Sequence, residues 1–306
     1  MLFPGQGSQS VGMLSELASA FSIVGETYAE ASEVFGRDLW QLSSEGSPEQ
    51  LAQTELTQPL MLVAGVAVWR CWLAADGSMP TMLAGHSLGE YSALVAADAI
   101  DFSDAVHVVA ERARLMQSAV PAGEGAMAAI LGLEDEIVEA ICRESAENAV
   151  VSAANYNSPG QLVIAGDSAA VERATHACLD AGARKVLRLP VSVPSHCALM
   201  APAATALETV LAGIEIRPPK LPVLHNVDVA TRSDPAAIRE ALVAQLCAPV
   251  RWTASVRKIA EADLTVMGEC GPGRILCGLG RRIDRQLSWI ALDTPSGLEE
   301  LSARLT

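Results

Sequence analysis

A serine held between two glycines is the residue of this sequence with the clearest potential for chemistry. Gly85-His86-Ser87-Leu88-Gly89 has the pattern G-x-S-x-G, with an apolar run before it and a helical pattern after it. In that setting the pattern predicts a strained turn from strand to helix, which lifts the serine hydroxyl out of the sheet. Glycine on both sides lets the backbone pass closely. Ser87 is therefore the candidate nucleophile of an acyl transfer; the alternative is a glycine-rich turn with a capping serine.

A serine nucleophile needs a base, and the sequence offers five histidines: His86, His107, His176, His196 and His225. The preferred base is His196, because it follows a rigid turn, Val193-Pro194-Ser195, at the end of a predicted strand, where catalytic loops of α/β folds gather. The alternative is a structural role, because a lone histidine is a packing residue at least as often as it is a catalytic base. The other four lie within the serine turn, on predicted helices or beside a strand, and they favour packing or surface positions.

An acid that orients the histidine would complete a catalytic triad, but no clear candidate is present. Between Ser87 and His196 the acidic residues lie mostly on helices expected to face solvent, and none stands out at a strand end. We therefore expect a backbone or amide oxygen to hold the imidazole. This expectation disfavours a standard esterase.

Arg112 lies late in a predicted helix that runs from Ser103 to about Val120. A planar guanidinium binds a carboxylate through two hydrogen bonds, so a buried arginine would suit an acyl group that ends in a free carboxylate. A hydrolase of plain esters would have no use for it. The alternative is a surface arginine paired with Glu111 or another neighbour.

Charge and length limit the class of protein that must position these residues. The 306 residues are 50% hydrophobic, which is enough for one large domain or two unequal ones. Lys and Arg number 21 against 36 Asp and Glu, so the net charge is −15. An acidic chain repels phosphate backbones and anionic lipids, which disfavours nucleic-acid and membrane-surface binding. The composition is typical of a soluble α/β enzyme.

Cysteine usage and the first residues favour a reducing, cytoplasmic setting. The seven cysteines are odd in number and scattered, and no C-x-x-C pair occurs, which indicates reduced thiols rather than disulfides or a metal site. No basic region followed by an apolar region, as in a signal peptide, opens the chain. The longest apolar stretch, Leu60 to Trp69, is about half of the ~20 residues that a membrane-spanning helix needs.

The pattern of strands and helices changes between Gly125 and Val191. Strands and helices alternate there in the order β-α-β-β-α-β, with strands predicted at 126–133, 150–155, 161–165 and 185–191 and helices at 134–148 and 168–181. This is the ferredoxin-like order. We therefore predict a small subdomain over residues 125–191 inserted into a large one made of residues 1–124 and 192–306.

Outside this insert, alternating strands and helices predict a mostly parallel sheet covered on both faces. A short strand, Leu2-Phe3, runs into a shaped loop, Pro4 to Gln9, and another strand, Thr81 to Ala84, precedes the serine turn. A single helix is predicted from Met13 to Phe35. A second, from Thr57 through Trp72, is apolar nearly all round and should be buried.

Several separated motifs together resemble the malonyl-CoA:acyl carrier protein transacylase family of fatty-acid synthesis. The three main ones are Phe3–Gln9, Gly85–Tyr91 and Pro194–His196. Four supporting stretches keep the family's order: Thr57–Pro59, Arg112–Gln117, Asn155–Gln161 and Gln245–Trp252. The resemblance covers nearly the whole chain, and it implies an α/β fold with a hydrolase-like core and a ferredoxin-like insert.

The resemblance also implies roles for individual residues. The family's nucleophile corresponds to Ser87, its base to His196, and the two backbone N–H groups of its oxyanion hole to Gln6 and Leu88. The arginine that binds the malonyl carboxylate corresponds to Arg112. The glutamine whose main-chain carbonyl orients the histidine corresponds to Gln245, and Asn157 lies in a family motif at the substrate cleft.

In terms of activity, the resemblance implies a malonyl-CoA:acyl carrier protein acyltransferase that uses no metal or cofactor and is cytoplasmic and monomeric. Its partners would be malonyl-CoA and acyl carrier protein. Both are anionic, so local basic patches must attract them; candidates are Arg184, Lys185 and Arg188 and, near the C-terminus, Arg281, Arg282 and Arg285. The alternatives are a trans-acting acyltransferase for polyketide synthesis, a serine thioesterase or other hydrolase, a non-catalytic carrier-binding module, and a preference for methylmalonyl.

Overall fold

The computed structural model describes residues 1–191, 193–262 and 264–305, and its larger sheet is parallel throughout, with the strand order β7-β2-β1-β8-β9. Its strands are β1 (Leu2–Phe3), β2 (Leu83–Gly85), β7 (Val223–Leu224), β8 (Val266–Glu269) and β9 (Ser288–Ala291). The sequence prediction of a mostly parallel sheet is confirmed. Besides the two strands named above, the sequence predicts strands at 223–227 and 264–267, where β7 and β8 lie, but it predicts none at β9.

Both faces of this sheet are buried. Phe3, Leu83 and Val223 belong to one hydrophobic cluster, whereas their strand neighbours Leu2 and Ala84 belong to another on the opposite face. Successive side chains of a strand point to opposite faces, so short apolar strands without polar alternation are what a sheet covered on both sides requires.

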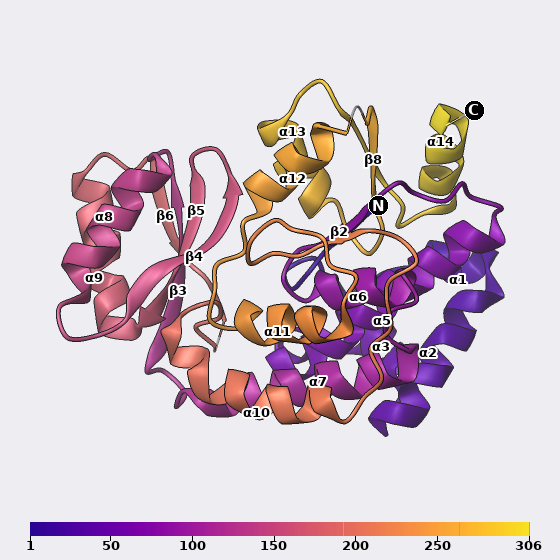
Figure 1. Ribbon diagram of the computed structural model, residues 1–306, viewed down its shortest axis with the longest axis horizontal. Helices are drawn as coiled ribbons and strands as arrows, with labels where there is room; N and C mark the ends of the chain where they lie inside the picture. Colours follow the sequence, from indigo (N-terminus) through magenta and orange to yellow (C-terminus); the bar gives the residue numbers. More distant parts are fainter. Residues whose placement is uncertain (192, 263, 306) are drawn as a thin grey trace.

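A second, smaller sheet is antiparallel, with the order β4-β5-β3-β6. Its elements are β3 (Gly125–Leu131), α8 (Asp135–Ala146), β4 (Val151–Ser158), β5 (Gln161–Asp167), α9 (Ser168–Asp180) and β6 (Lys185–Arg188). This is the predicted β-α-β-β-α-β succession, and Figure 1 shows it as a separate body on the left. The exact subdomain boundaries stay a prediction, and residue 192 lies outside the described residues.

Helix α5 (Thr54–Ala74) is the central helix of the large part, and nearly all of its residues are buried. It begins three residues before the predicted start at Thr57. Among the described residues it is the one helix long and apolar enough to cross a membrane, but 89% of that stretch is buried inside the protein. It is therefore a core helix, as its apolar circumference predicts.

The remaining helices surround the large sheet. Their bounds are α1 (Ser15–Ala20), α2 (Ser22–Phe35), α3 (Leu39–Glu45), α4 (Pro48–Leu51), α6 (Gly89–Ala96), α7 (Phe102–Ala119), α10 (Ala201–Ala212), α11 (Pro235–Gln245), α12 (Trp252–Ala260), α13 (Ile275–Ile283) and α14 (Pro295–Leu305), with a 3₁₀ turn, η1 (Ala198–Met200). The prediction of one helix from Met13 to Phe35 is wrong. The chain is extended at Phe21 (φ −132°, ψ 112°), and this breaks the segment into α1 and α2.

Adjacent parallel strands bring two of the sequence motifs together. Leu2 pairs with Ala84 and Phe3 with Gly85, so the loop after β1 and the serine turn after β2 emerge at the same edge of the sheet. The His86 N–H donates a hydrogen bond to the Phe3 carbonyl at 2.9 Å. Carboxyl ends of parallel strands are where α/β folds build their sites, and the serine lies at such an edge.

The turn leaves no room for side chains at its two glycines. A Cβ on Gly85 would lie 1.9 Å from the Gly89 carbonyl carbon, and a Cβ on Gly89 would lie 2.1 Å from the Phe3 carbonyl oxygen. Both contacts are with backbone, which cannot swing away. The spacing of G-x-S-x-G therefore follows from the packing of α6 against β1 and β2.

Replacing Gly89 by alanine should lower the free energy of unfolding by about 3 kcal/mol, because β1 must shift to admit the methyl group. Urea denaturation of the variant measures this. Gly25→Ala on α2 is the control, since a Cβ there meets nothing within 4 Å, and it should gain up to about 1 kcal/mol from better helix propensity. Equal stability of Gly89→Ala and wild type would contradict the packing argument.

Candidate active site

A cleft of about 110 Å³ contains the serine turn and the preferred base. Its lining residues are Gln6, Thr54, His86, Ser87, Met127, Asn155, Leu189, Val191, Val193, Ser195 and His196. They come from both parts of the chain, since Met127 lies on β3 of the small sheet and Ser87 follows β2 of the large one. The candidate nucleophile thus lies where the two parts meet.

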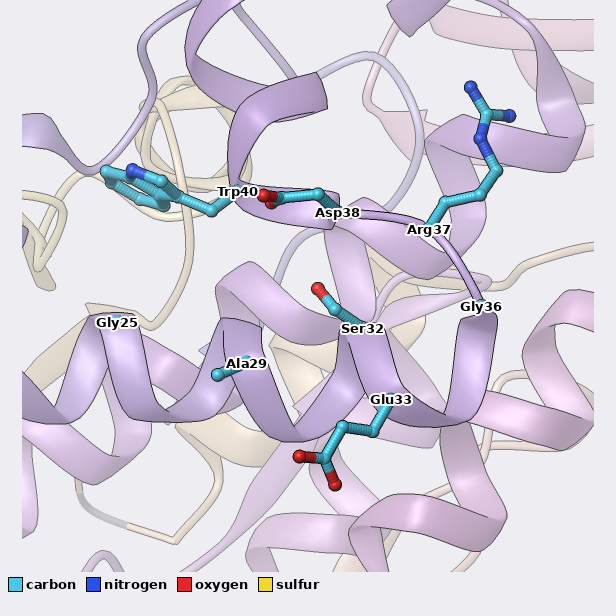
Figure 2. Close-up of a pocket in the computed structure, with 8 residues that line it drawn as sticks. All are labelled: Gly25, Ala29, Ser32, Glu33, Gly36, Arg37, Asp38 and Trp40. Atoms are coloured by element: carbon cyan, nitrogen blue, oxygen red, sulfur yellow. The ribbon is translucent and has the colours of Figure 1, made fainter.

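A larger groove, of about 580 Å³, lies on the surface formed by α2 and the start of α3, and Figure 2 shows its lining residues: Gly25, Ala29, Ser32, Glu33, Gly36, Arg37, Asp38 and Trp40. Trp40 and Arg37 stand at opposite ends of it. None of the candidate site residues lines this groove. The smaller cleft is therefore the candidate active site, because it alone of the two brings the candidate nucleophile and the candidate base together.

Ser87 sits in a strained backbone conformation, with φ at +51°. A positive φ at a residue with a side chain is held only when the surroundings determine it, and such residues gather at active sites. The Ser87 hydroxyl oxygen lies 2.7 Å from His196 Nε2. The structure therefore brings the two residues into hydrogen-bond contact across 109 positions of sequence.

His196 is held from behind by a main-chain carbonyl. Its Nδ1 lies 2.8 Å from the carbonyl oxygen of Gln245. Because a carbonyl only accepts, Nδ1 carries the proton, and the lone pair of Nε2 faces the Ser87 hydroxyl. The arrangement matches the expectation that an oxygen other than a carboxylate orients the imidazole.

Burial keeps the imidazole neutral. The His196 side chain is 3% exposed, and desolvation, with the positive charge of Arg112 as a second cause, lowers its pKa to about 3. A neutral imidazole is the form that accepts a proton from serine. His196 is thus in its basic form over the whole physiological pH range.

The pH dependence of the first half-reaction should reflect this depressed pKa. A histidine base with an ordinary pKa loses half of its activity at about pH 6.5 as the pH falls. Because the pKa of His196 is about 3, kcat/KM should stay nearly constant from about pH 8 to about pH 5. Malonyl-pantetheine is the suitable donor because it lacks the titrating phosphates of CoA, and circular dichroism checks that the fold persists. An acid limb centred near pH 6.5 would contradict the assignment.

Two backbone N–H groups beside the serine are available to bind negative charge. Within the described parts of the chain, the N–H groups of Gln6 and Leu88 donate no hydrogen bond, whereas the Ser87 N–H does. Leu88 precedes α6 directly, so its N–H lies at the positive end of that helix. Gln6 belongs to the loop after β1, which lines the same cleft.

Arg112 is buried rather than paired on the surface. It is 1% exposed, and its guanidinium donates to the side-chain oxygens of Gln58, at 2.5 Å, and Gln245, at 3.0 Å. Glu111 binds Arg114 instead, at 2.7 Å. Within the described residues no carboxylate forms an ion pair with Arg112, and burial lowers its pKa. A buried cation with two neutral acceptors is suited to bind an anion.

Asn157 lies beside the serine turn but contacts His86 and not Ser87. Its Oδ1 is 2.8 Å from His86 Nε2, and burial lowers the pKa of His86. The cleft itself is lined by Asn155, two residues earlier on β4. The substrate-binding role of Asn157 therefore stays a prediction.

Three polar residues around the site were missed as site residues by sequence reasoning. Gln58 binds Arg112; Asn226 binds the Ser87 N–H; and Glu90, 1% exposed, accepts hydrogen bonds from Asn226 and Gln245. His225, expected to be a satisfied core histidine, lies 2.7 Å from Glu90 through Nδ1. Their positions in the sequence could have pointed to them: Asn226 follows a buried strand closely, and Gln58 is a polar residue on an otherwise apolar helix.

In residues 1–191, 193–262 and 264–305 no group of three or more His, Cys, Asp or Glu could hold a metal ion. All seven cysteines are free, and burial raises the pKa of several of their thiols, Cys71 to about 11 and Cys197 to about 12 among them. The candidate residues gathered in the cleft are of the types that nucleophilic catalysis uses.

Comparison with known proteins confirms the resemblance drawn from the motifs. The acyl transferase domain family matches residues 1–277. Malonyl CoA-acyl carrier protein transacylase from Salmonella typhimurium is 55% identical over 305 residues, 100% of this chain and 98% of that protein. Its counterpart from Escherichia coli K12 is 54% identical over 297 residues, 97% of this chain and 96% of that protein.

Solved structures show the same fold. Malonyl CoA-acyl carrier protein transacylase from Coxiella burnetii aligns with a TM-score of 0.99 at 49% identity, covering 100% of this chain and 97% of that one. A malonyl-transacylase in complex with its type II PKS acyl-carrier protein aligns with a TM-score of 0.98 at 52% identity, covering 99% and 98%. The chain therefore belongs to the malonyl CoA-acyl carrier protein transacylase family of acyl transferases.

Proposed function

We propose that this protein transfers the malonyl group from malonyl-CoA to the phosphopantetheine thiol of acyl carrier protein and so supplies fatty-acid synthesis. One observation carries the choice of acyl group: Arg112 is buried with only neutral hydrogen-bond acceptors, and Gln245 links it to the catalytic pair. A free carboxylate on the acyl group would complete this site. The names of relatives 54–55% identical over nearly the whole chain support the same function.

In the first half-reaction Ser87 Oγ attacks the thioester carbonyl carbon while His196 Nε2 takes the hydroxyl proton. The carbonyl oxygen becomes an oxyanion, which the N–H groups of Gln6 and Leu88 bind. The carbon–sulfur bond then breaks, and the imidazolium gives its proton to the departing CoA sulfur. Malonyl remains on Ser87 as an ester.

In the second half-reaction the phosphopantetheine thiol occupies the place that CoA has left. His196 takes the thiol proton, the sulfur attacks the ester carbonyl, and the oxyanion forms in the same position. Breakage of the carbon–oxygen bond returns the proton to Ser87. The kinetics are therefore ping-pong, and the chemistry uses side chains and backbone N–H groups alone, so we expect no metal or cofactor.

Arg112 binds the free carboxylate of the malonyl group in both half-reactions. Its planar guanidinium forms two parallel hydrogen bonds with a carboxylate, which offsets the loss of hydration on burial. A plain acyl thioester would leave the cation without an anion. This pairing favours malonyl over acetyl and gives a serine hydrolase of plain esters no advantage.

Exposed basic side chains in two segments of the chain are the proposed contacts for the anionic substrates. Arg184, Lys185 and Arg188 lie on and beside β6, and all three are exposed. The chain continues from there to Leu189 and Val191 in the wall of the cleft. Arg281 and Arg282, on α13, are also exposed, and Arg285 follows them. Such patches raise the association rate with acidic partners even on a chain of net charge −15. A soluble, cytoplasmic monomer is part of the same proposal.

Mass measurement of the carrier protein tests the function directly. The chain is incubated with malonyl-CoA and holo acyl carrier protein, and the carrier should gain the mass of one malonyl group. Apo carrier protein, which lacks the thiol, is the control and should gain nothing. Release of free malonate without loading of the carrier would overturn the proposal and favour a thioesterase.

Supply of a polyketide synthase is the second candidate, because the relative solved with its type II PKS acyl-carrier protein is 52% identical to this chain. The chemistry is the same, and only the carrier differs. Initial rates with a fatty-acid carrier and a type II polyketide carrier at equal concentration distinguish the two. A higher kcat/KM for the polyketide carrier would favour this alternative.

A further inference from the structure

The strained turn at Ser87 is bridged by one side chain from a distant part of the sequence. Asn226 Oδ1 accepts a hydrogen bond from the Ser87 N–H at 2.7 Å, and Asn226 Nδ2 donates one to the Gly85 carbonyl at 2.7 Å. The two backbone groups lie on either side of His86, so a single amide ties the end of β2 to the nucleophile. Only an amide in this orientation satisfies both, because a flip would set donor against donor.

Asn226 is itself fixed by its surroundings. It is 1% exposed and follows β7, the parallel neighbour of β2. Its N–H donates to Glu90 Oε2 at 3.0 Å, and its carbonyl accepts from the Arg251 N–H at 3.2 Å. Because the backbone of Asn226 is fixed by hydrogen bonds at both its N–H and its carbonyl, the side chain loses little conformational freedom when it binds the serine turn. It can therefore hold the backbone of that turn in one conformation.

Glu90 anchors the arrangement to the rest of the site. Its buried carboxylate accepts hydrogen bonds from the Asn226 N–H and from Gln245 Nε2 at 2.9 Å, and it lies 2.7 Å from His225 Nδ1. Gln245 Nε2 also donates to the Ser87 carbonyl at 3.0 Å. Both the N–H and the carbonyl of Ser87 are therefore held by side chains of residues that bind the same carboxylate, Asn226 through its backbone N–H and Gln245 through Nε2.

The bond to Asn226 also decides which N–H groups can bind the oxyanion. Because the Ser87 N–H is engaged, the N–H of Leu88, the next residue of the chain, is the free donor of the turn. Any rotation of the Ser87 peptide moves this donor together with the hydroxyl. A small error there costs rate, since a displacement of about 1 Å lowers catalysis about 100-fold.

We infer that Asn226 is a positioning residue for the nucleophile: its side-chain amide holds Ser87 at positive φ so that the hydroxyl faces His196 and the Leu88 N–H faces the oxyanion. Asn226 touches no reacting atom and acts through the peptide groups of residues 85 and 87. The inference rests on the proposed function only in taking Ser87 as the nucleophile.

Asn226→Ala tests the inference through two rates: labelling of Ser87 by a fluorophosphonate, and formation of acyl-serine from malonyl-CoA in a rapid-quench experiment. Both should fall by about 100-fold, with KM for malonyl-CoA changed less than about threefold. Asn226→Asp keeps an acceptor for the Ser87 N–H but loses the donor to the Gly85 carbonyl, so both of its rates should lie between those of the alanine variant and wild type. This variant replaces Asn226→Ala in the test if the alanine variant does not fold.

Leu39→Ala separates positioning from a loss of stability. Leu39 is fully buried on α3, away from the serine turn. Its truncation to alanine should lower the melting temperature of the protein, but Ser87 in this variant should be labelled at the same rate as in wild type. Asn226 variants that label as fast as Leu39→Ala would overturn the inference and leave Asn226 a structural role. Wild type that fails to label at all would instead overturn Ser87 as the nucleophile and, with it, the proposed function.

Discussion

Replacing Ser87 by alanine should abolish the covalent malonyl adduct and lower malonyl transfer by about 10⁴-fold or more. The Ser87 hydroxyl lies 2.7 Å from His196 Nε2 and is therefore the hydroxyl that this base can deprotonate for ester formation. The variant loses this group but keeps the cleft, Arg112 and the free N–H groups, so it should still bind malonyl-CoA. Intact-mass measurement after acid quench detects the adduct, and stopped assays measure the rate.

Ser92→Ala is the matched control for this experiment. Ser92 is 1% exposed on α6, one turn and a residue beyond Ser87, so its truncation tests whether removing any buried hydroxyl nearby has the same effect. It should retain the adduct and most of the rate. An adduct that persists in Ser87→Ala would show that another residue carries the malonyl group.

Arg112→Ala should lower malonyl transfer by about 10²- to 10³-fold while acetyl transfer stays the same or rises. The loss corresponds to about 3–4 kcal/mol, within the range typical of leaving a buried charge, here the malonyl carboxylate, without its partner. An acetyl group has no such charge, and removal of the buried cation also raises the basicity of His196, whose pKa Arg112 lowers. The ratio of kcat/KM for malonyl-CoA and acetyl-CoA is the measurement.

Arg114→Ala provides the control for the arginine variant. Arg114 lies two residues on, is exposed and pairs with Glu111, and exposed pairs of this kind contribute at most about 1 kcal/mol. Its preference for malonyl should match wild type. An unchanged ratio in Arg112→Ala would refute the carboxylate-binding role, whatever the effect on stability.

Sequence reasoning predicted the parts of this fold that depend on local pattern. The G-x-S-x-G spacing follows from steric contact between Gly85, Gly89 and the backbone of β1, and the succession of strands and helices from 125 to 191 follows from hydrophobic periodicity. The break at Phe21 was missed because an apolar residue within a helical pattern gives no sign of a turn. The strand β9 is also too short to show a period, and, unlike β1, it does not lead into a motif that marks its end.

Contacts made across long stretches of sequence were harder to predict. Asn226 binds a peptide group 139 positions away, and Arg112 binds Gln245 across 133 positions. Neither pair has a local signature; only the folded chain brings them together. The expectation that an oxygen other than a carboxylate holds His196 depended on the lack of a well-placed acid. Its partner, the carbonyl of Gln245, is a group common to every residue, so only the family resemblance pointed to this position.

The positive charge of Arg112 acts on His196 before any substrate is present, and it helps to hold the imidazole at a low pKa. If Arg112 binds the malonyl carboxylate as proposed, the carboxylate cancels much of this charge, and the imidazole becomes a stronger base once the malonyl group is bound. An acetyl group has no carboxylate, so the charge of Arg112 continues to disfavour protonation of His196. Selection among acyl groups then operates on the chemical step as well as on affinity. The acyl group whose carboxylate pairs with Arg112 also raises the basicity of His196, the residue that takes the serine proton.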